Sequence, residues 1–492
     1  MREGFLIGGG LIVVGLLLEA IVGPVDWGTF RWPVNGVVMG LFLMLIGAMH
    51  LLQKRVYVFQ FMGTSKAAVP ALVYVVVLTV VMGLVPQKSL TPGPSSMGEG
   101  SFWINYMLNF WPFVLTYVYI DVILGLAVIR QVKTWTANHF SLSTFRFSLL
   151  SHLGLFLAMT AATLGNADMQ RLKMIVVRGE AEWRAMTPQL QVVEMPIAIE
   201  LREFIMEVYD NGKPKRYASD VQILTRTGKS IHAIVEVNKP VKVEGWKIYQ
   251  YSYDTQKGPM SQTSILELVC DPWLPVVYVG IYLMLAGAVC FMLRSIPWAG
   301  GWRRAREHPR RALSIAVLIG AVFFCVHHFM PILHSDTLVP ALQSPWFRPH
   351  IIAYMLAYTL MGSAAVMALY QLVRDSALSS SPLTVSSPRG GREGVGSLVF
   401  VGLSLITIGM LFGALWAKEA WGHYWSWDPK ETWAAITWFS YLVFVHYRQI
   451  PAHKPKLALW LLLISFALLQ MCWWGIKFLP SAQETSVHVY GT

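Results

Sequence analysis

Charged residues are scarce in this sequence. Aspartate, glutamate, lysine and arginine together make up 13% of the 492 residues, about half of their usual share in soluble proteins. Residues of the hydrophobic set make up 55%, and apolar runs of about 20 residues recur along the chain. This composition excludes an ordinary soluble enzyme and predicts a polytopic α-helical membrane protein. It also excludes a transmembrane β-barrel, which would show short segments of alternating hydrophobicity.

Cysteine is also rare. The four cysteines, Cys270, Cys290, Cys325 and Cys472, lie far apart, and no two of them form a Cys-x-x-Cys pair. Three of the four lie inside apolar runs. The sequence therefore predicts neither a disulfide framework nor a zinc site.

Eleven apolar runs predict transmembrane helices. They cover residues 5–23, 33–51, 68–85, 111–129, 147–165, 273–293, 313–331, 350–372, 397–416, 434–447 and 458–478. The first run has the charged start of a signal peptide. However, a second run follows almost at once and no small-residue cleavage site stands out, so we expect a first transmembrane helix.

Basic residues outnumber acidic ones, 39 to 27, which gives a net charge of +12. Such a charge would suit a nucleic-acid partner, but the basic residues gather in alternate loops between the apolar runs. These loops are 52–66, 131–146, 294–312, 373–396 and 448–457. Since basic loops face the cytoplasm in helical membrane proteins, the charge predicts orientation, with membrane lipid and not nucleic acid as the partner. The N-terminus is then inside and the C-terminus outside.

Residues 166–272 return to a soluble composition and contain several segments with a two-residue hydrophobic period. They predict an all-β domain of about a hundred residues outside the cytoplasm, for which a β-sandwich is a suitable fold. Asn211-Gly212 lies between two of these segments and predicts a hairpin turn. In contrast, 376–396 is rich in Ser, Pro and Gly without an apolar period, which predicts a flexible inside linker.

An outside loop, 417–433, contains the most unusual segment of the sequence. Four tryptophans, Trp421, Trp425, Trp427 and Trp433, occur here within thirteen residues, together with Asp428, Lys430 and Glu431. Tryptophan offers a wide apolar face and one N–H donor, so this cluster could form a floor for a large, flat aromatic ligand whose polar edge the charged residues orient. The alternative is an interfacial aromatic belt, which accounts for scattered tryptophans in most membrane proteins.

Four histidines are candidate iron ligands. His152 and His446 lie inside apolar runs at a similar depth in the inner half of the bilayer, so they could supply both axial nitrogens of one haem iron. His350 and His488 lie on the outer side, level with the tryptophan-rich loop. For each histidine alone, a structural role remains the alternative. Nothing in the spacing of His423 predicts that it is a ligand.

The string WGHYWSWDPKETWAAITWFSYLVFVHYR at 421–448 resembles the WWD signature of haem-handling proteins of cytochrome c maturation, in the form of the CcsA (ResC) branch. Upstream, LLSHLGLFLAMTAATLGNADMQRLKMIVVRGE and VNKPVKVEGWKIYQYSYD resemble the ResB (CcsB) partner. The chain thus resembles a fused system II cytochrome c synthase.

The resemblance implies four segments along the chain. Residues 1–165 hold the N-terminal transmembrane helices, which are ResB-like from about residue 147, and 166–272 form the ResB-like β domain. A transmembrane helix and a basic cytoplasmic loop follow at 273–312. Residues 313–492 form the CcsA-like haem-handling domain, with the WWD loop at 417–433 outside.

The resemblance also implies an activity and its site. The family's external haem ligands fall on His350 and His488, and its transmembrane pair falls on His152 and His446. The implied protein lies in the bacterial inner membrane, binds haem b transiently as a substrate, and attaches it to the Cys-x-x-Cys-His motif of apocytochrome c. Thiol-reducing proteins would be further partners, since the motif's thiols must be reduced. The chain itself has no Cys-x-x-Cys-His, as expected of a catalyst and not of its substrate.

Two other functions stay open at this point. A haem exporter without ligation activity would share every ligand. A membrane cytochrome b would hold haem permanently between paired histidines for electron transfer, but its ligands should lie within the membrane and the tryptophan-rich loop would have no role.

Overall fold

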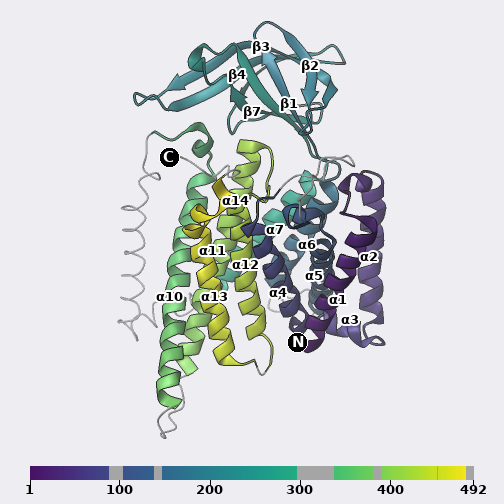
Figure 1. Cartoon of the computed structure of the whole chain (residues 1–492), viewed down its shortest axis with the longest axis vertical. Coiled ribbons are helices and arrows are strands. Elements are labelled where there is room, and N and C mark those ends of the chain that lie inside the picture. The colour runs from purple at the N-terminus through teal and green to yellow at the C-terminus, as the bar shows by residue number, and fades with distance from the viewer. Residues whose placement is uncertain (88–102, 138–146, 296–336, 380–388, 452, 484–492) are drawn as a thin grey trace.

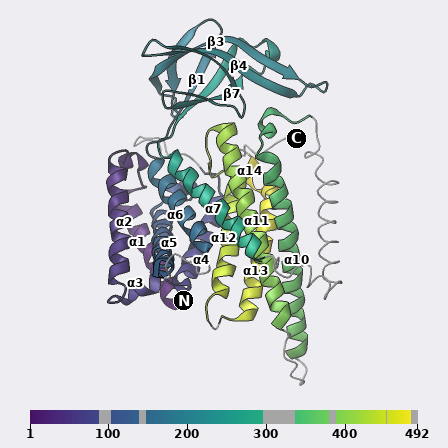
Figure 2. The ribbon, with the colours of Figure 1, turned by 180° about the vertical axis from the view of Figure 1, so that it is seen from behind.

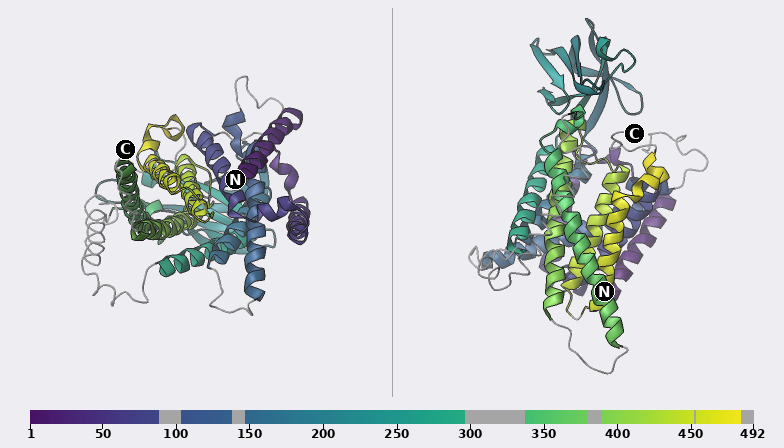
Figure 3. Two further views of the ribbon diagram at one scale, coloured as in Figure 1. Left: turned by 90° about the horizontal axis from the view of Figure 1, so that it is seen from below. Right: turned by 90° about the vertical axis from the view of Figure 1, so that its left-hand side faces the viewer.

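A helical bundle carries a β domain on one of its ends (Figure 1). The structure is a computed structural model of the chain, and it describes residues 1–87, 103–137, 147–295, 337–379, 389–451 and 453–483. The reverse view in Figure 2 and the side view in Figure 3 show the same division, with the β domain beyond the end of the bundle. Seen from below, α1–α6 and α10–α13 form two neighbouring groups of helices (Figure 3).

The helices follow the apolar runs of the sequence. Their bounds are α1 Arg2–Val22, α2 Val34–Leu52, α3 Tyr57–Met62, α4 Ser65–Leu84, α5 Trp111–Ala137, α6 Ser148–Gly165, α7 Leu274–Ser295, α10 Phe347–Ser379, α11 Arg389–Trp421, α12 Pro429–Arg448, α13 Pro455–Trp473 and α14 Pro480–Gln483. Within the described ranges, nine of these helices are long and apolar enough to cross a membrane. The predicted span 313–331 lies outside the described residues.

Helix α12 contains the predicted span 434–447 but is not one of those nine. It lies inside the bundle against α4, α11 and α13, and most of its side chains are buried. A helix surrounded by other helices need not be apolar on every side, because polar side chains such as Thr437 and Ser440 bond to backbone carbonyls within the protein. The polar character of α12 is therefore a result of its central position.

Glycines bring α6 and α7 close together. A Cβ on Gly154 would lie 2.6 Å from the carbonyl oxygen of Gly280, and one on Gly287 would lie 2.3 Å from Oγ of Ser151. Small residues allow this close backbone approach between membrane helices. Because α6 enters the β domain and α7 leaves it, the same contact joins the two ends of that domain. It also fixes α6 at Ser151, next to His152.

The β domain consists of one antiparallel sheet with eight strands in the order β5-β4-β3-β2-β1-β8-β7-β6. The strands are β1 Gln170–Val177, β2 Ala181–Met186, β3 Val192–Val208, β4 Pro214–Thr225, β5 Ser230–Glu236, β6 Val241–Val243, β7 Trp246–Tyr253 and β8 Thr263–Cys270. The sheet curls around its own buried core, so that β5 contacts β6 and β7. The expected two-sheet sandwich is wrong, because pairing of β1 with β8 makes the sheet continuous.

The hairpin predicted at Asn211-Gly212 is confirmed. It joins β3 to β4, and Gly212 has a φ of 77°, the left-handed conformation that glycine adopts without strain. The N–H of Lys213 donates to the side-chain oxygen of Asn211 at 3.0 Å.

The flexible linker predicted at 376–396 is wrong at both of its ends. Helix α10 continues to Ser379 and α11 already begins at Arg389. Helices that are anchored in a bundle can extend beyond their apolar segments, because each added residue gains a hydrogen bond without a new nucleation cost. The segment 380–388 lies outside the described residues.

The two ends of the bundle differ in charge. The end away from the β domain lies near α3 and the start of α4 (Figure 1). The chain segments that border α3, α4, the last turns of α5 and the turn between α12 and α13 are basic there, with Lys54, Arg55, Lys66, Arg130, Lys133, Arg448, Lys454 and Lys456. At the β-domain end, carboxylates that accept hydrogen bonds are more frequent, and they include Asp168, Asp271, Glu419 and Asp428. This asymmetry is the three-dimensional form of the loop pattern seen in the sequence.

Candidate functional site

A cavity of about 770 Å³ lies inside the bundle, between the two groups of helices. Its walls come from α4, α5, α6, α7, α11 and α12. Apolar side chains line its interior, among them Leu72, Leu155, Phe400 and Leu403. Its volume falls in the range of cavities that bind cofactors and other small molecules.

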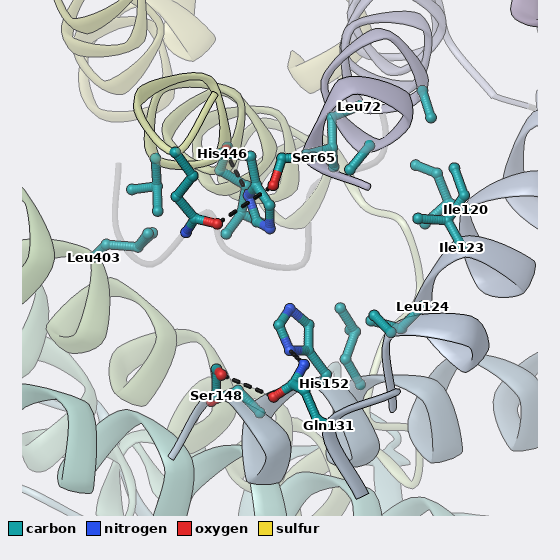
Figure 4. Close-up of a pocket in the computed structure, with 18 of the residues that line it drawn as sticks. Ser65, Leu72, Ile120, Ile123, Leu124, Gln131, Ser148, His152, Leu403 and His446 are labelled. Atoms are coloured by element: carbon teal, nitrogen blue, oxygen red, sulfur yellow. Dashed lines mark hydrogen bonds between the residues drawn. The ribbon is translucent and has the colours of Figure 1, made fainter. Parts of the chain in front are cut away.

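His152 extends into this cavity from α6 (Figure 4). Its Nδ1 lies 2.9 Å from Nε2 of Gln131 on α5, and the other end of the same amide accepts a hydrogen bond from Ser148 at 2.9 Å. These contacts hold the ring in place from two neighbouring helices. They leave Nε2 of His152 as the nitrogen toward the cavity. In this arrangement the Gln131 N–H donates to Nδ1, so a neutral ring carries its hydrogen on Nε2. Iron binding at Nε2 therefore requires the Gln131 amide to turn, so that its oxygen accepts from Nδ1–H.

His446 faces His152 from α12, on the opposite wall (Figure 4). Its Nδ1–H donates to the carbonyl oxygen of Leu442, one turn earlier, at 2.9 Å. This bond sets the tautomer in which Nε2 carries a lone pair. Histidines that bind metals through Nε2 commonly make such a bond with the other nitrogen.

The two rings are spaced as a pair of axial ligands would be. Their centroids are 6.3 Å apart, and their planes are inclined by 64°. Two imidazoles on opposite sides of one metal, each bonded at about 2.0 Å, place their ring centroids roughly 6 Å apart. The spacing of the two rings therefore matches that of two imidazoles on opposite sides of one metal ion.

The tryptophan-rich loop connects α11 to α12 at the β-domain end. Asp428 begins α12 as its N-cap, and its carboxylate accepts a hydrogen bond from the N–H of Glu431 at 2.8 Å. The carboxylate of Glu431 in turn accepts from the N–H of Ser426 at 2.7 Å. The structure thus gives Asp428 and Glu431 a role in the shape of the loop, where the sequence suggested ligand contacts.

The four tryptophans do not form one floor. Trp421 packs on Trp416 with ring centroids 5.2 Å apart, and Trp425 meets Trp427 edge to face at 5.7 Å. Trp433 is buried elsewhere, among side chains of α12, α13 and α14, and its N–H donates to the carbonyl oxygen of Gly83 at 3.3 Å. Trp433 is therefore a packing residue of the bundle.

Trp425 has a feature that the others lack. Its Nε1 is buried and has no hydrogen-bond partner among the described residues. A buried indole N–H usually donates to an acceptor, since a buried donor without a hydrogen bond is costly in free energy. This donor fits a site for a ligand with polar groups at its edge.

His350 lies near the start of α10, on the tryptophan side of the molecule. Its Nδ1–H donates to the carbonyl oxygen of Gly409 on α11 at 2.7 Å, and Trp416 lies 5.9 Å from its ring. Trp416 in turn contacts Trp421, so aromatic rings connect His350 to the loop. His488 lies outside the described residues.

Helix α11 separates His350 from the inner cavity. Thr407 lines that cavity and Gly409 bonds to His350, although the two residues are only two positions apart. Successive residues of an α-helix turn by about 100°, so these two point to nearly opposite sides of α11. The two histidine sites thus use the two faces of one helix.

His423, for which the sequence predicts no ligand role, lies at a place that the sequence did not indicate. It is 8% exposed and lines a second cavity of about 280 Å³, together with Gln87, Trp427, Asp428 and Ser481. This cavity lies between the loop and the end of α4. Its position inside the tryptophan cluster was the available signal, but spacing along the chain does not show that α4 completes a pocket around it.

An ion pair joins the β domain to the base of the loop. Nζ of Lys418 on α11 lies 3.1 Å from the carboxylate of Asp271, just after β8, and the two side chains are 1% and 6% exposed. Lys418 also donates to the carbonyl oxygen of Gly422 at 2.9 Å. Nearby on β7, burial lowers the pKa of Lys247, and Lys242 lowers it further, while Asp271 and Glu419 oppose the shift.

Gly422 is a second contact between these parts. Its φ is 76°, and an added Cβ would lie 3.0 Å from Val269 and 3.2 Å from Tyr249 of the β domain. Only a residue without a side chain meets both conditions. The loop therefore begins in direct contact with strands β7 and β8.

Two family models match successive parts of the chain. The family model described as "Cytochrome C assembly protein" matches residues 281–482, and the "ResB-like family" model matches 147–267. The "Cytochrome c biogenesis protein CcsA" of Porphyra purpurea is 30% identical over 224 residues, which are 35% of this chain and 69% of that protein. Its namesake in Prochlorococcus marinus (strain MIT 9301) is 31% identical over 207 residues, 37% of this chain and 65% of that protein.

Other relatives are covered less fully. The CcsA protein of Guillardia theta is 33% identical over 174 residues, and the chain spans 56% of its length. The chain spans 44% of the length of the CcsA protein of Chlamydomonas reinhardtii, with 30% identity over 158 residues.

The fold and the matches together define a polytopic membrane protein of cytochrome c biogenesis. The chain belongs to the CcsA family, with a ResB-like part fused before the CcsA-like part.

The Lys418–Asp271 pair yields a prediction for stability. Lys418→Met leaves a buried carboxylate without its cation, and we expect a loss of about 3 kcal/mol at the β-domain contact. The double variant Lys418→Met/Asp271→Leu should recover most of this loss, since no charge is left buried. The measurement is the thermal unfolding midpoint of the detergent-purified protein. The exposed Lys430 provides the control, and an equal midpoint for Lys430→Met and Lys418→Met would contradict the assignment.

Proposed function

We propose that this chain binds haem b in the inner cavity, transfers it to the tryptophan-rich loop and attaches it to apocytochrome c. The observation that carries the proposal is the facing pair His152 and His446, whose ring centroids lie 6.3 Å apart in a cavity of about 770 Å³. Two neutral imidazoles at this spacing suit the two axial positions of a haem iron. The family's role in cytochrome c biogenesis supplies the destination of the haem.

The proposed orientation places the basic end of the bundle in the cytoplasm. Positive charge marks cytoplasmic loops, and this end holds the basic residues of the described loops. The β domain, the tryptophan-rich loop and the C-terminus then lie on the outer side of a bacterial inner membrane. In this orientation, the inner cavity receives haem from the side where it is made, and the loop faces an exported apocytochrome.

The outer site would use residues from both ends of the CcsA-like part. His350 and His488 are the proposed axial ligands, and Trp421, Trp425 and Trp427 provide aromatic faces beside them. The N–H of Trp425, which lacks an acceptor among the described residues, would bond to the edge of the bound haem. Asp428 and Trp433 act less directly in this proposal, through the shape and anchoring of the loop.

The ligation step requires few groups from the enzyme. The histidine of the Cys-x-x-Cys-His motif displaces one axial ligand, and each motif thiol then adds across one vinyl group of haem. A sulfur–carbon bond forms, and the thiol hydrogen passes to the other vinyl carbon, so the addition itself consumes no oxidant. Because both thiols must be reduced, thiol-reducing proteins are further partners. The chain contributes mainly position, which can account for a large share of an enzymatic rate.

The test of this function is maturation in a host without its own system. Wild-type protein co-expressed with an apocytochrome c should produce a cytochrome band that keeps its haem stain on a denaturing gel, since only thioether-bound haem survives there. His350→Ala or His488→Ala should abolish the band, because each removes a proposed ligand at the transfer site. Trp425→Phe should reduce it severalfold, while the buried core substitution Trp433→Phe should affect protein yield and stained band in proportion.

The alternatives predict other results. A haem exporter would carry bound haem and yield no stained cytochrome, even with reduced thiols supplied. A cytochrome b would behave in the same way on the gel, and His350→Ala would alter only its redox properties. The absence of a stained band for wild-type protein would therefore refute the synthase assignment.

A further inference from the structure

Two basic residues stand at the mouth of the inner cavity. Lys66 of α4 and Arg130 of α5 both line it, and both side chains are exposed at the end away from the β domain. None of the described residues that line the cavity is acidic. The mouth is therefore cationic, while the interior is largely apolar apart from its histidine, serine and threonine side chains.

Each basic residue is adjacent to a residue connected with one of the two histidines. Arg130 precedes Gln131, whose amide contacts His152 at 2.9 Å. Lys66 follows Ser65, whose hydroxyl lies 3.5 Å from the side-chain oxygen of Gln449, three residues after His446. Both walls thus repeat one arrangement, with an imidazole deeper in the cavity and a cation closer to the surface.

The backbone at Gly63 leaves space for the guanidinium group. A Cβ placed on Gly63 would lie 3.4 Å from a terminal nitrogen of Arg130. The guanidinium therefore packs over a residue that has no side chain, beside the start of α4 where Lys66 lies. This places the two cations at the same end of the cavity.

We propose that Arg130 and Lys66 form a carboxylate-binding subsite, which holds the two propionate groups of the haem whose iron lies between His152 and His446. The inference rests on the proposed function. Haem has an apolar body and two carboxylates on one edge, which matches a cavity with apolar walls and one cationic mouth. Arginine suits carboxylates because its planar N–H groups can bond both oxygens, whereas lysine acts as a point charge. Haem would then enter with its carboxylates at the basic end.

Positive charge at this end also serves orientation in the membrane, so the test must separate the two roles. Lys54 and Lys133 lie at the same end and do not line the cavity, which makes them matched controls. Lys133 is one turn after Arg130 on the same helix. Glutamine at each position keeps length and polarity while it removes the charge.

The experiment measures the affinity of the purified, haem-depleted full-length protein for haem and for haem dimethyl ester, which lacks the carboxylate charges. Because exposed ion pairs are weak, Arg130→Gln and Lys66→Gln should each weaken haem binding about fivefold, and the double variant about twentyfold. Affinity for the diester should change less than twofold. Lys54→Gln and Lys133→Gln should change neither affinity by more than twofold.

Equal losses for haem and its diester would overturn the subsite, as would a loss of the same size in Lys133→Gln. An anionic lipid headgroup is the other source of the same chemistry, so the titrations are repeated in nanodiscs of neutral lipid and of neutral lipid with phosphatidylglycerol. A charge effect seen only with phosphatidylglycerol would assign the two cations to lipid and overturn the proposal. His152→Ala separates the two levels of the account: if it leaves the affinity and spectrum of haem unchanged, the inner haem site itself fails, whatever Arg130 does.

Discussion

The packing of the N-terminal helices on the C-terminal ones brings His152 and His446 together, and the cavity depends on this packing. The two imidazoles belong to parts of the chain nearly 300 residues apart, one in the ResB-like match and one in the CcsA-like match. Their spacing of 6.3 Å exists only while α4 packs on α12 and α7 packs on α11. Polar groups inside a membrane are costly and need partners within the protein, and here Gln131 and the Leu442 carbonyl provide them. A fused chain keeps both walls of the cavity together by covalent connection.

The β domain is connected both to the helices beside the inner cavity and to the tryptophan-rich loop. It enters through α6, which carries His152, and leaves through α7, which packs against α6 at three glycines. The domain also contacts the base of the tryptophan-rich loop, through Val269 and Tyr249 of its strands and through Asp271 just after β8. A displacement of the sheet would therefore move both α6 and the loop. This gives the domain a physical link to the inner cavity and to the proposed transfer site.

Much of the helical fold could be predicted from the sequence. A helix that crosses a lipid bilayer needs a long apolar run, and such a run is recognised from the residue types alone. The strands could be predicted in a similar way, from the two-residue hydrophobic period within 166–272. The single curled sheet could not be predicted, because the pairing of β1 with β8 joins residues nearly 100 positions apart. The helical ends at 376–379 and 389–396 were missed because Ser, Pro and Gly suggest a linker, while anchored helices can extend through such residues.

The candidate site, like the fold, could be predicted from the sequence only in part. The expected depth of His152 and His446 in the membrane was enough to select them as candidate ligands. The contacts of their rings with the Gln131 amide and with the Leu442 carbonyl could be seen only in the structure. The loop was found by its composition alone. Its internal division was not, because capping by Asp428 and burial of Trp433 depend on α4 and on the start of α12. The pocket at His423 requires the same long-range contact.

The most direct test of the central claim is the reduction potential of the bound haem after each inner histidine is replaced by methionine. Axial methionine raises the potential of a haem relative to a second histidine. We expect His152→Met and His446→Met each to raise the potential and to produce a His/Met absorption signature. His453→Met, at the same end of the bundle but outside the cavity lining, should do neither. Bound haem whose potential and spectrum stay the same in both inner variants would contradict the claim that these two rings hold the iron.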